Sequence, residues 1–225
     1  MEISLYQIDA FASELFEGNP AAVCPLNEWL PDQIMQSIAA ENNLSETAFF
    51  VPKNTSFHIR WFTPKSEIDL CSHATLASAY VLFNILGYKK DKIEFDSRSG
   101  ILTVTRDTEW LVMDFPLQPP VSCYIPDEIV AAFDKMPIEC LKAEDFIVVF
   151  DREDDIESAT PDLGQLLKID LRGVIITAKS TRYDFVSRFF APKYGIPEDP
   201  VTGSAYTQLV PYWASKIDSN RFHAR

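Results

Sequence analysis

The stretch DLCSHATLASAYVLF, residues 69–83, decides the fold of this chain. After Cys71-Ser72-His73 the residues are nearly all apolar, and the run ends at Gly87. A helix that is apolar all round is buried all round, and glycine commonly ends a helix. The stretch therefore predicts a helix inside a core, with a thiol, a hydroxyl and an imidazole at its start.

The features around this stretch recur downstream in the same order. RWFTPK at 60–65 precedes an acidic loop and the apolar helix, and RFFAPK at 188–193 precedes EDPVTGSAYTQLV at 198–210. Strand, Arg-aromatic-Phe-x-Pro-Lys, acidic loop and apolar helix recurring together indicate a duplication. A duplicated fold of this kind tends to place equivalent helix starts on either side of one cleft.

The duplication predicts two lobes, residues 1–115 and 125–225. The segment 116–124 between them is rich in proline, which stiffens an extended connection. Further helices are expected within 30–43, 127–136 and 160–169, the last beginning at Thr160-Pro161. Strand-like runs separate the helices and indicate a mixed α/β (α+β) protein.

Composition excludes several classes of protein. The 225 residues carry 33 acidic and 20 basic side chains, a net charge of −13, which argues against a nucleic-acid surface. No apolar run is long enough to span a membrane, and the acidic N-terminus is unlike a signal peptide. Four cysteines without a pairing pattern then favour reduced thiols and a cytoplasmic location.

Motifs for cofactors and metals are absent from the sequence. It has no G-x-G-x-x-G, no P-loop and no G-x-S-x-G. With three histidines and no C-x-x-C or H-x-x-x-H spacing, a single Cys-x-His is weak evidence for zinc. We therefore expect neither cofactor nor metal.

The two helix starts are candidate anion sites. The first backbone N–H groups of a helix lack partners, and the helix dipole adds positive charge there. Ser72-His73-Ala74-Thr75 opens one helix and Thr202-Gly203-Ser204-Ala205 opens the other, with small residues that let a carboxylate approach. The alternative is that Ser72 and Thr202 serve only as N-caps.

Four side chains could carry proton chemistry or support it. Glu46 in LSETAFF lies beside apolar residues, where burial would raise its pKa toward that of a general acid/base, unless it is an ordinary surface residue at a strand entry. Asp199 could cap a turn or orient an acid/base group. His73 could shuttle a proton in its neutral form, whereas Cys71 is interpreted as a small buried apolar residue.

The segments FEGNPAAV, LSETAFF, IRWFTPKSEIDLCSHATLASA and EDPVTGSA resemble the signature segments of the PhzF-like family of phenazine-biosynthesis type. The resemblance covers essentially the whole chain. It implies a fold like that of diaminopimelate epimerase and proline racemase. Each of two pseudo-symmetric lobes is then a curved, mostly antiparallel sheet rolled around a central helix.

The resemblance also implies roles for particular residues. Glu46 matches the general acid/base of the family, and His73 and Asp199 match residues that hold and polarise the substrate. Gly203 and Ser204 match donors to a substrate carboxylate, and Asn19 is similar to a ligand-contacting asparagine of the related epimerases. A homodimer is the oligomeric state that relatives suggest.

Three departures from the related proteins bear on mechanism. Ser72 stands where the family usually has glycine, and family members continue past FHAR at 222–225 with closing strands. The related epimerases use two cysteines as acid and base, but TGSA at 202–205 has none. One carboxylic acid that moves a proton between two carbons on one face of a substrate fits better than a two-thiol racemase.

The sequence thus predicts a cofactor-independent isomerase of a small carboxylic acid, with Glu46 as acid/base and Asn19, Ser72, Gly203 and Ser204 binding substrate. The alternatives are a non-catalytic ligand- or protein-binding module on the same fold and, less favoured, a thiol or metal protein built on Cys71 and His73. The identity of the substrate is not encoded in these motifs.

Overall fold

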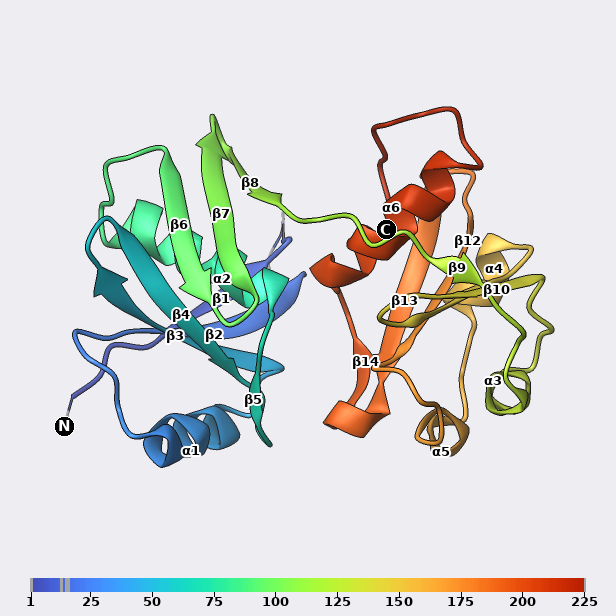
Figure 1. Ribbon diagram of the computed structural model, residues 1–225, viewed down its shortest axis with the longest axis horizontal. Coiled ribbons are helices and arrows are strands. Elements are labelled where there is room, and N and C mark those ends of the chain that lie inside the picture. Colours follow the sequence, from blue (N-terminus) through green and yellow to red (C-terminus); the bar gives the residue numbers. More distant parts are fainter. Residues whose placement is uncertain (1, 13, 15–16, 225) are drawn as a thin grey trace. The chain divides into compact units, whose positions relative to one another are not determined.

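The computed structural model describes residues 2–12, 14 and 17–224. The chain divides into two compact units, Met1–Phe115 and Pro116–Arg225, each with hydrophobic clusters of its own (Figure 1). None of the described helices has the length and apolar character that crossing a membrane requires.

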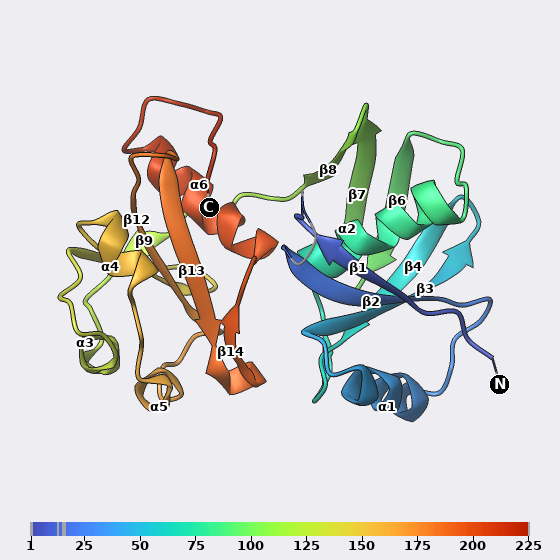
Figure 2. The same ribbon diagram turned by 180° about the vertical axis from the view of Figure 1, so that it is seen from behind.

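The first unit is one curved sheet wrapped around a helix (Figures 1 and 2). Its spatial order is β1-β2-β3-β4-β6-β7-β8, with β5 paired to β4. The pairs β2·β3 and β4·β6 are parallel and the other neighbours are antiparallel. The strands are β1 (Tyr6–Ala10), β2 (Asn19–Pro25), β3 (Glu46–Lys53), β4 (Ser56–Phe62), β5 (Glu67–Ile68), β6 (Lys92–Ser97), β7 (Gly100–Asp107) and β8 (Trp110–Asp114).

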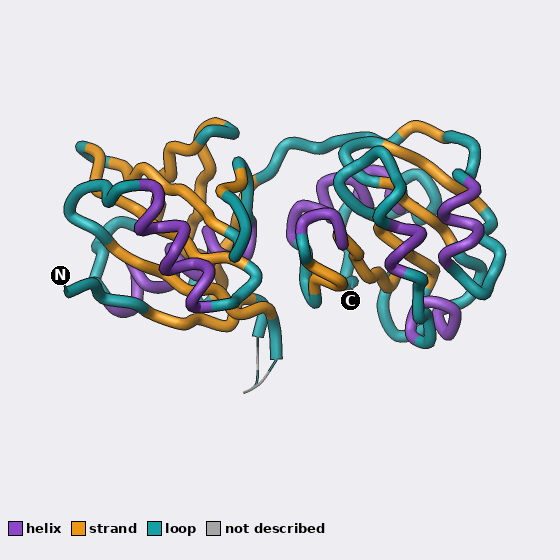
Figure 3. The backbone as a smooth tube through the Cα atoms, turned by 90° about the horizontal axis from the view of Figure 1, so that it is seen from below, coloured by secondary structure: helices purple, strands orange, loops and turns teal. Residues whose placement is uncertain are grey.

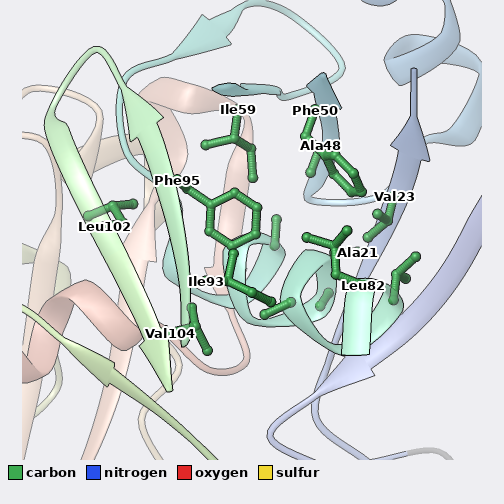
Figure 4. Close-up of a cluster of buried hydrophobic side chains, with 14 of the residues drawn as sticks. Ala21, Val23, Ala48, Phe50, Ile59, Leu82, Ile93, Phe95, Leu102 and Val104 are labelled. Atoms are coloured by element: carbon green, nitrogen blue, oxygen red, sulfur yellow. The ribbon is translucent and has the colours of Figure 1, made fainter. Parts of the chain in front are cut away.

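Two helices pack on opposite faces of this sheet. Helix α2 (Ser72–Tyr80) lies against the inner face, where side chains from β2, β3, β4, β6 and β7 form the main core (Figure 4). Helix α1 (Asp32–Asn42) lies on the outer face (Figure 3). It packs there through a smaller cluster that includes Met35 and Phe49. Alternation along β3 separates the two cores, because Ala48 and Phe50 face α2 while Phe49 faces α1.

The expected central helix is confirmed, with a different end. Seven of the nine residues of α2 are buried, as predicted for a central helix enclosed on every side. After Tyr80 the backbone widens into a π-helical segment, η1 (Val81–Ile85), before Gly87 turns the chain with a φ of 70°. The helix that the sequence predicts thus ends in a wider coil that keeps Leu82 and Phe83 in the core.

The second unit repeats the design with a six-stranded sheet, counted over the described residues. The order is β14-β13-β12-β11-β10-β9, and β11·β12 is its parallel pair. The strands are β9 (Val121–Ser122), β10 (Glu139–Lys142), β11 (Phe146–Val149), β12 (Val174–Lys179), β13 (Phe185–Ala191) and β14 (Ile196–Asp199). Helix α6 (Tyr206–Ala214) packs on one face, preceded by the 3-10 turn η3 (Gly203–Ala205).

The opposite face of the second sheet is covered by short helices, α3 (Asp127–Ala132), α4 (Glu153–Glu157) and α5 (Leu163–Leu166). Three details differ from expectation. The proline-rich segment contributes β9 to the sheet, and α4 was not predicted. Helix α5 begins after Asp162, not at Thr160-Pro161, because the Asp162 carboxylate accepts hydrogen bonds from the N–H groups of Gly164 and Gln165.

The duplication predicted from the sequence is visible as a repeated ion pair. Arg60 on β4 forms two hydrogen bonds of 2.7 Å with the Glu67 carboxylate on β5. Arg188 on β13 does the same with Glu198 on β14, at 2.7 and 2.8 Å. In each unit a forked guanidinium therefore ties the strand to the short returning strand that leads into the central helix.

A second correspondence lies at matching positions, three residues before each arginine. Phe57 of β4 pairs in parallel with Phe95 of β6, and Phe185 of β13 forms a parallel bridge with Ala224. In each pair, the second partner comes after the central helix of its unit in the chain. The repeat therefore extends beyond the motifs that the sequence comparison used.

Candidate active site

The first group of site residues gathers where β3 begins. Glu46 is the first residue of β3 and lies on the same face as Ala48 and Phe50, toward α2. It pairs in register with Ala21, so Asn19, two residues earlier on β2, lies on that face as well. Asn19 is wholly buried and Glu46 is 7% exposed, which excludes the surface interpretation of Glu46.

Gly18 fixes where Asn19 enters the strand. Its φ is 80°, a region that side chains disfavour. A Cβ at this position would lie 2.2 Å from the Ala10 carbonyl oxygen, so the turn accepts only glycine. The Gly-Asn pair that the sequence singled out is thus a turn followed by a buried amide.

The imidazole of His73 meets the Glu46 carboxylate. His73 is the second residue of α2 and is 3% exposed. Its Nε2 lies 3.3 Å from Glu46 Oε2. Burial lowers the pKa of His73 from 6.5 to about 4, so the imidazole is neutral near neutral pH. The site therefore pairs a carboxyl group with a neutral imidazole in an enclosed, water-poor place.

Cys71 extends this pair into a row of three groups. Its Sγ lies 3.5 Å from Nδ1 of His73, on the side of the ring away from Glu46. Potential ligand atoms of the three residues lie within 4.8 Å of one another. However, His73 contacts the thiol through one nitrogen and the carboxylate through the other, whereas a shared ion would need both partners around a single nitrogen. The geometry therefore places the three groups in a row of contacts, with the imidazole between the thiol and the carboxylate, and not around one shared nitrogen.

Ser72 is not the N-cap of α2. The N-cap residue is Cys71, which makes no side-chain capping bond, and Ser72 is the first helical residue. Ser72 is 5% exposed, so its hydroxyl is held inside the unit at the helix start. The interpretation of Ser72 as only a cap is therefore wrong.

Thr202 likewise makes no side-chain cap. It precedes η3, and its hydroxyl instead donates a hydrogen bond to the Asp199 carboxylate. Asp199 is half-buried at the end of β14. Thr202 occupies the N-cap position without capping through its side chain, so the alternative that it serves only as a cap is not supported, and Asp199 is tied into the turn that presents Gly203.

Ser204 is held by residues that the sequence did not indicate. Its hydroxyl oxygen accepts a hydrogen bond of 3.2 Å from Arg172 Nη1. Because a guanidinium only donates, Ser204 keeps its own proton to donate elsewhere. A buried hydroxyl fixed in this way is suited to an anionic oxygen, which supports the anion-site interpretation of this helix start.

Arg172 is in turn held by Asp145, whose carboxylate and backbone N–H are fixed by Gln208. Asp145 is wholly buried and accepts from Arg172 Nε at 2.9 Å and Nη2 at 2.5 Å. Gln208 Nε2 donates to the same carboxylate at 2.7 Å, while its Oε1 accepts from the Asp145 N–H. Both charged residues lie in turns before strands, where sequence patterns suggest ordinary surface residues, so nothing in the sequence marked them.

The fold recurs in a solved structure of the racemase type. A probable proline racemase from Agrobacterium radiobacter shares the fold, with a TM-score of 0.59 over 96% of this chain and 78% of that one at 8% identity. This likeness confirms the fold of the racemases and epimerases that the sequence predicted. The family model described as phenazine biosynthesis-like protein matches residues 8–224. The chain belongs to this PhzC-PhzF family.

More similar relatives agree. An uncharacterized isomerase of Pseudomonas aeruginosa is 50% identical over 224 residues, which is all of this chain and 86% of that protein. The human phenazine biosynthesis-like domain-containing protein is 35% identical, covering 100% of this chain and 88% of its own length. The crystal structure of a PhzF-family protein from Enterococcus faecalis superposes with a TM-score of 0.95 at 47% identity, over 100% of this chain and 86% of that one.

Proposed function

We propose that this protein is a cofactor-independent isomerase that moves a proton between two carbons of a small carboxylic acid, with Glu46 as the general acid/base. The observation that carries the proposal is the buried contact of 3.3 Å between Glu46 Oε2 and His73 Nε2. Relatives at 50% and 43% identity are named isomerases, which supports the reaction class.

The neutral imidazole decides how the proton is shared. With its pKa near 4, His73 does not compete with Glu46 for a proton near neutral pH. Glu46 can therefore take a proton from a carbon and return it to another, while His73 donates a hydrogen bond to the carboxylate or to a substrate oxygen. General acid–base catalysis of this kind contributes about 10²–10⁴-fold to rate.

In the second unit, the segment before α6 is proposed to bind a carboxylate. Its support is the Ser204 hydroxyl, which Arg172 leaves free to donate, together with the small residue Gly203 beside it. Donors of this kind also stabilise negative charge that develops when a proton leaves carbon. Asp199, which holds the turn through Thr202, is proposed to position these donors.

Hydrogen exchange tests the proposal. The purified protein is incubated in D₂O with a panel of small carboxylic acids, each unsaturated or bearing a hydrogen next to an activating group, and followed by proton NMR. We expect deuterium to enter at least one acid, and Glu46→Gln to slow entry by about 10²-fold or more. Glu109→Gln, which changes an exposed residue of the same unit, is the matched control and should behave as wild type.

Two results would count against the isomerase. One is a panel in which the wild type labels nothing, while the acids still bind by ligand-observed NMR, as expected of a binding module. The other is exchange that proceeds equally well in Glu46→Gln, because the carboxyl group would then not carry the proton.

A further inference from the structure

Cys71 is the N-cap residue of α2, but its thiol does not cap the helix. An N-cap side chain normally accepts a hydrogen bond from a backbone N–H of the first turn. Cys71 makes no such bond, and its Sγ instead lies 3.5 Å from His73 Nδ1 at 6% exposure. The backbone oxygen of Cys71 accepts from the N–H and the hydroxyl of Thr75, so the helix start is held without the thiol.

Proton counting restricts the hydrogen bonds in this row. A neutral imidazole has one N–H donor and one acceptor nitrogen, and an ionised carboxylate can only accept. An ionised Glu46 favours the tautomer of His73 that carries its proton on Nε2, because this nitrogen lies 3.3 Å from the negative carboxylate oxygen. Nδ1 is then an acceptor, and the group that it faces, the Cys71 thiol, can donate its S–H.

The Cys71 thiol becomes important when Glu46 is protonated. A protonated carboxyl can donate as well as accept, so it no longer decides which ring nitrogen carries the proton. If His73 changed to the Nδ1–H form, Nε2 would accept the carboxyl proton and hold it. We propose that Cys71 is a positioning residue whose S–H keeps Nδ1 an acceptor, so that His73 retains its Nε2–H form in both protonation states of Glu46.

The consequence for the reaction is that the proton on Glu46 stays available for return to the substrate. This consequence rests on the proposed isomerisation, whereas the tautomer of His73 does not. It also gives a reason for a thiol at this place, because serine would be drawn toward the backbone N–H groups that an N-cap normally serves.

The test reads the tautomer directly from the ¹⁵N shifts of the His73 ring in the full-length protein, by two-bond ¹H–¹⁵N correlation. Glu46→Gln is the decisive background, because the amide offers Nε2 both a donor and an acceptor. We expect Nε2–H in the wild type and in Glu46→Gln. In Glu46→Gln/Cys71→Ala the Nδ1–H population should rise measurably.

Controls separate the thiol's role from packing. Glu46→Gln/Cys24→Ala removes another buried thiol of the same unit, one that packs on the α1 side of the sheet, and should retain Nε2–H. Glu46→Gln/Cys71→Val has no S–H but nearly fills the space of cysteine, so it should behave like the alanine variant even if a cavity perturbs the latter. Unchanged signals of His58 and His223 would show that the fold is intact.

The inference is overturned if Glu46→Gln already shows the Nδ1–H form, or if removal of Cys71 leaves the ring shifts of that background unchanged. Failure of the proposed reaction is a different result. If His73 keeps its Nε2–H form in Glu46→Gln and loses it when the Cys71 thiol is also removed, the positioning role is supported. This holds even if no acid exchanges hydrogen. If hydrogen exchange depends on Glu46 but the tautomer of His73 does not depend on Cys71, only the inference about Cys71 is overturned, and the proposed reaction stands.

Discussion

At the scale of single residues, burial sets the properties of the candidate site. Glu46 and His73 are nearly inaccessible, and burial depresses the pKa of the imidazole. A depressed imidazole pKa makes folding stability depend on pH. Because only the unfolded chain binds the proton between the two pKa values, the effect has a definite sign and window.

We predict that the free energy of unfolding decreases as the pH falls from 6.5 toward 4, with His73 contributing up to about 3 kcal/mol. Above 6.5 the imidazole is neutral in both states, and below about 4 it is charged in both. Urea unfolding at about pH 7 and about pH 5 measures the slope. His73→Gln should have a smaller slope than the wild type. The carboxylates titrate in both proteins, so the difference between the two slopes reports His73.

The exposed His223 supplies the control for this measurement. His223→Gln is measured alongside, as a histidine substitution outside the candidate site. A slope that is the same in wild type and His73→Gln would mean that the imidazole titrates normally in the folded protein.

Two thiols outside the site should be chemically inert. Burial raises the pKa of both Cys24 and Cys140 to about 12, so almost no thiolate forms near neutral pH. Native protein treated with iodoacetamide and analysed by mass spectrometry should remain unmodified at both, and urea should expose both. Rapid modification of either in the native state would show that its surroundings open.

At the scale of elements, the start of α6 is fixed by a buried ionic cluster. Asp145 precedes β11, Arg172 precedes β12 and Gln208 lies on α6, so three segments are tied around one carboxylate. Replacing one member of a buried pair leaves the other charge without compensation, and this costs more than the pair itself contributes.

We predict that Asp145→Asn destabilises the protein by about 3–5 kcal/mol. The neighbouring Glu144→Gln is the matched control, because Glu144 contacts the same arginine at 3.2 Å but its side chain is 37% exposed. Its removal should cost less than about 1 kcal/mol. Both values come from urea unfolding, and equal effects of the two substitutions would contradict the role of burial.

The elements also show what the sequence could and could not reveal. Apolar spacing predicted α1, α2 and α6, and the repeated Arg-aromatic-Phe-x-Pro-Lys segments predicted β4 and β13 as equivalents. Capping was predicted less well, because a serine or threonine beside a helix start signals a cap only if its hydroxyl reaches a backbone N–H. Ser72 is the first residue of α2, one position after the N-cap residue. The Thr202 hydroxyl bonds to Asp199 instead of a backbone N–H.

The sequence singled out several candidate site residues but not the contacts between them. Glu46 and His73 were both singled out, the former by its apolar context and both by resemblance to the family. Their contact joins β3 to α2, 27 residues apart in the chain, and depends on how the sheet curves around the helix. Arg172 and Asp145 could not be found, since a charge in a turn looks the same in sequence whether it is buried or exposed.

At the scale of the whole molecule, each unit contains its own core. The cluster around α2 includes only residues up to 115, and the clusters of the second unit begin at Cys123. Such an arrangement favours stability that is set locally, unit by unit.

We predict that core substitutions act within their own unit. Ile93→Ala in the first core and Ile176→Ala in the second each remove a wholly buried side chain and should cost about 2–5 kcal/mol. Hydrogen–deuterium exchange with mass spectrometry should show lost protection in peptides of the substituted unit. Equal loss in both units would show that the chain unfolds as one body.

The central claim is that one carboxyl group, Glu46, moves a proton from one carbon to another. The most direct measurement is the position of deuterium in the product after wild-type turnover in D₂O, with Glu46→Gln alongside. We predict label at a new carbon, on a single face of the molecule, and almost none with Glu46→Gln. Label confined to the original carbon with inversion of its configuration, or label that survives Glu46→Gln, would contradict it.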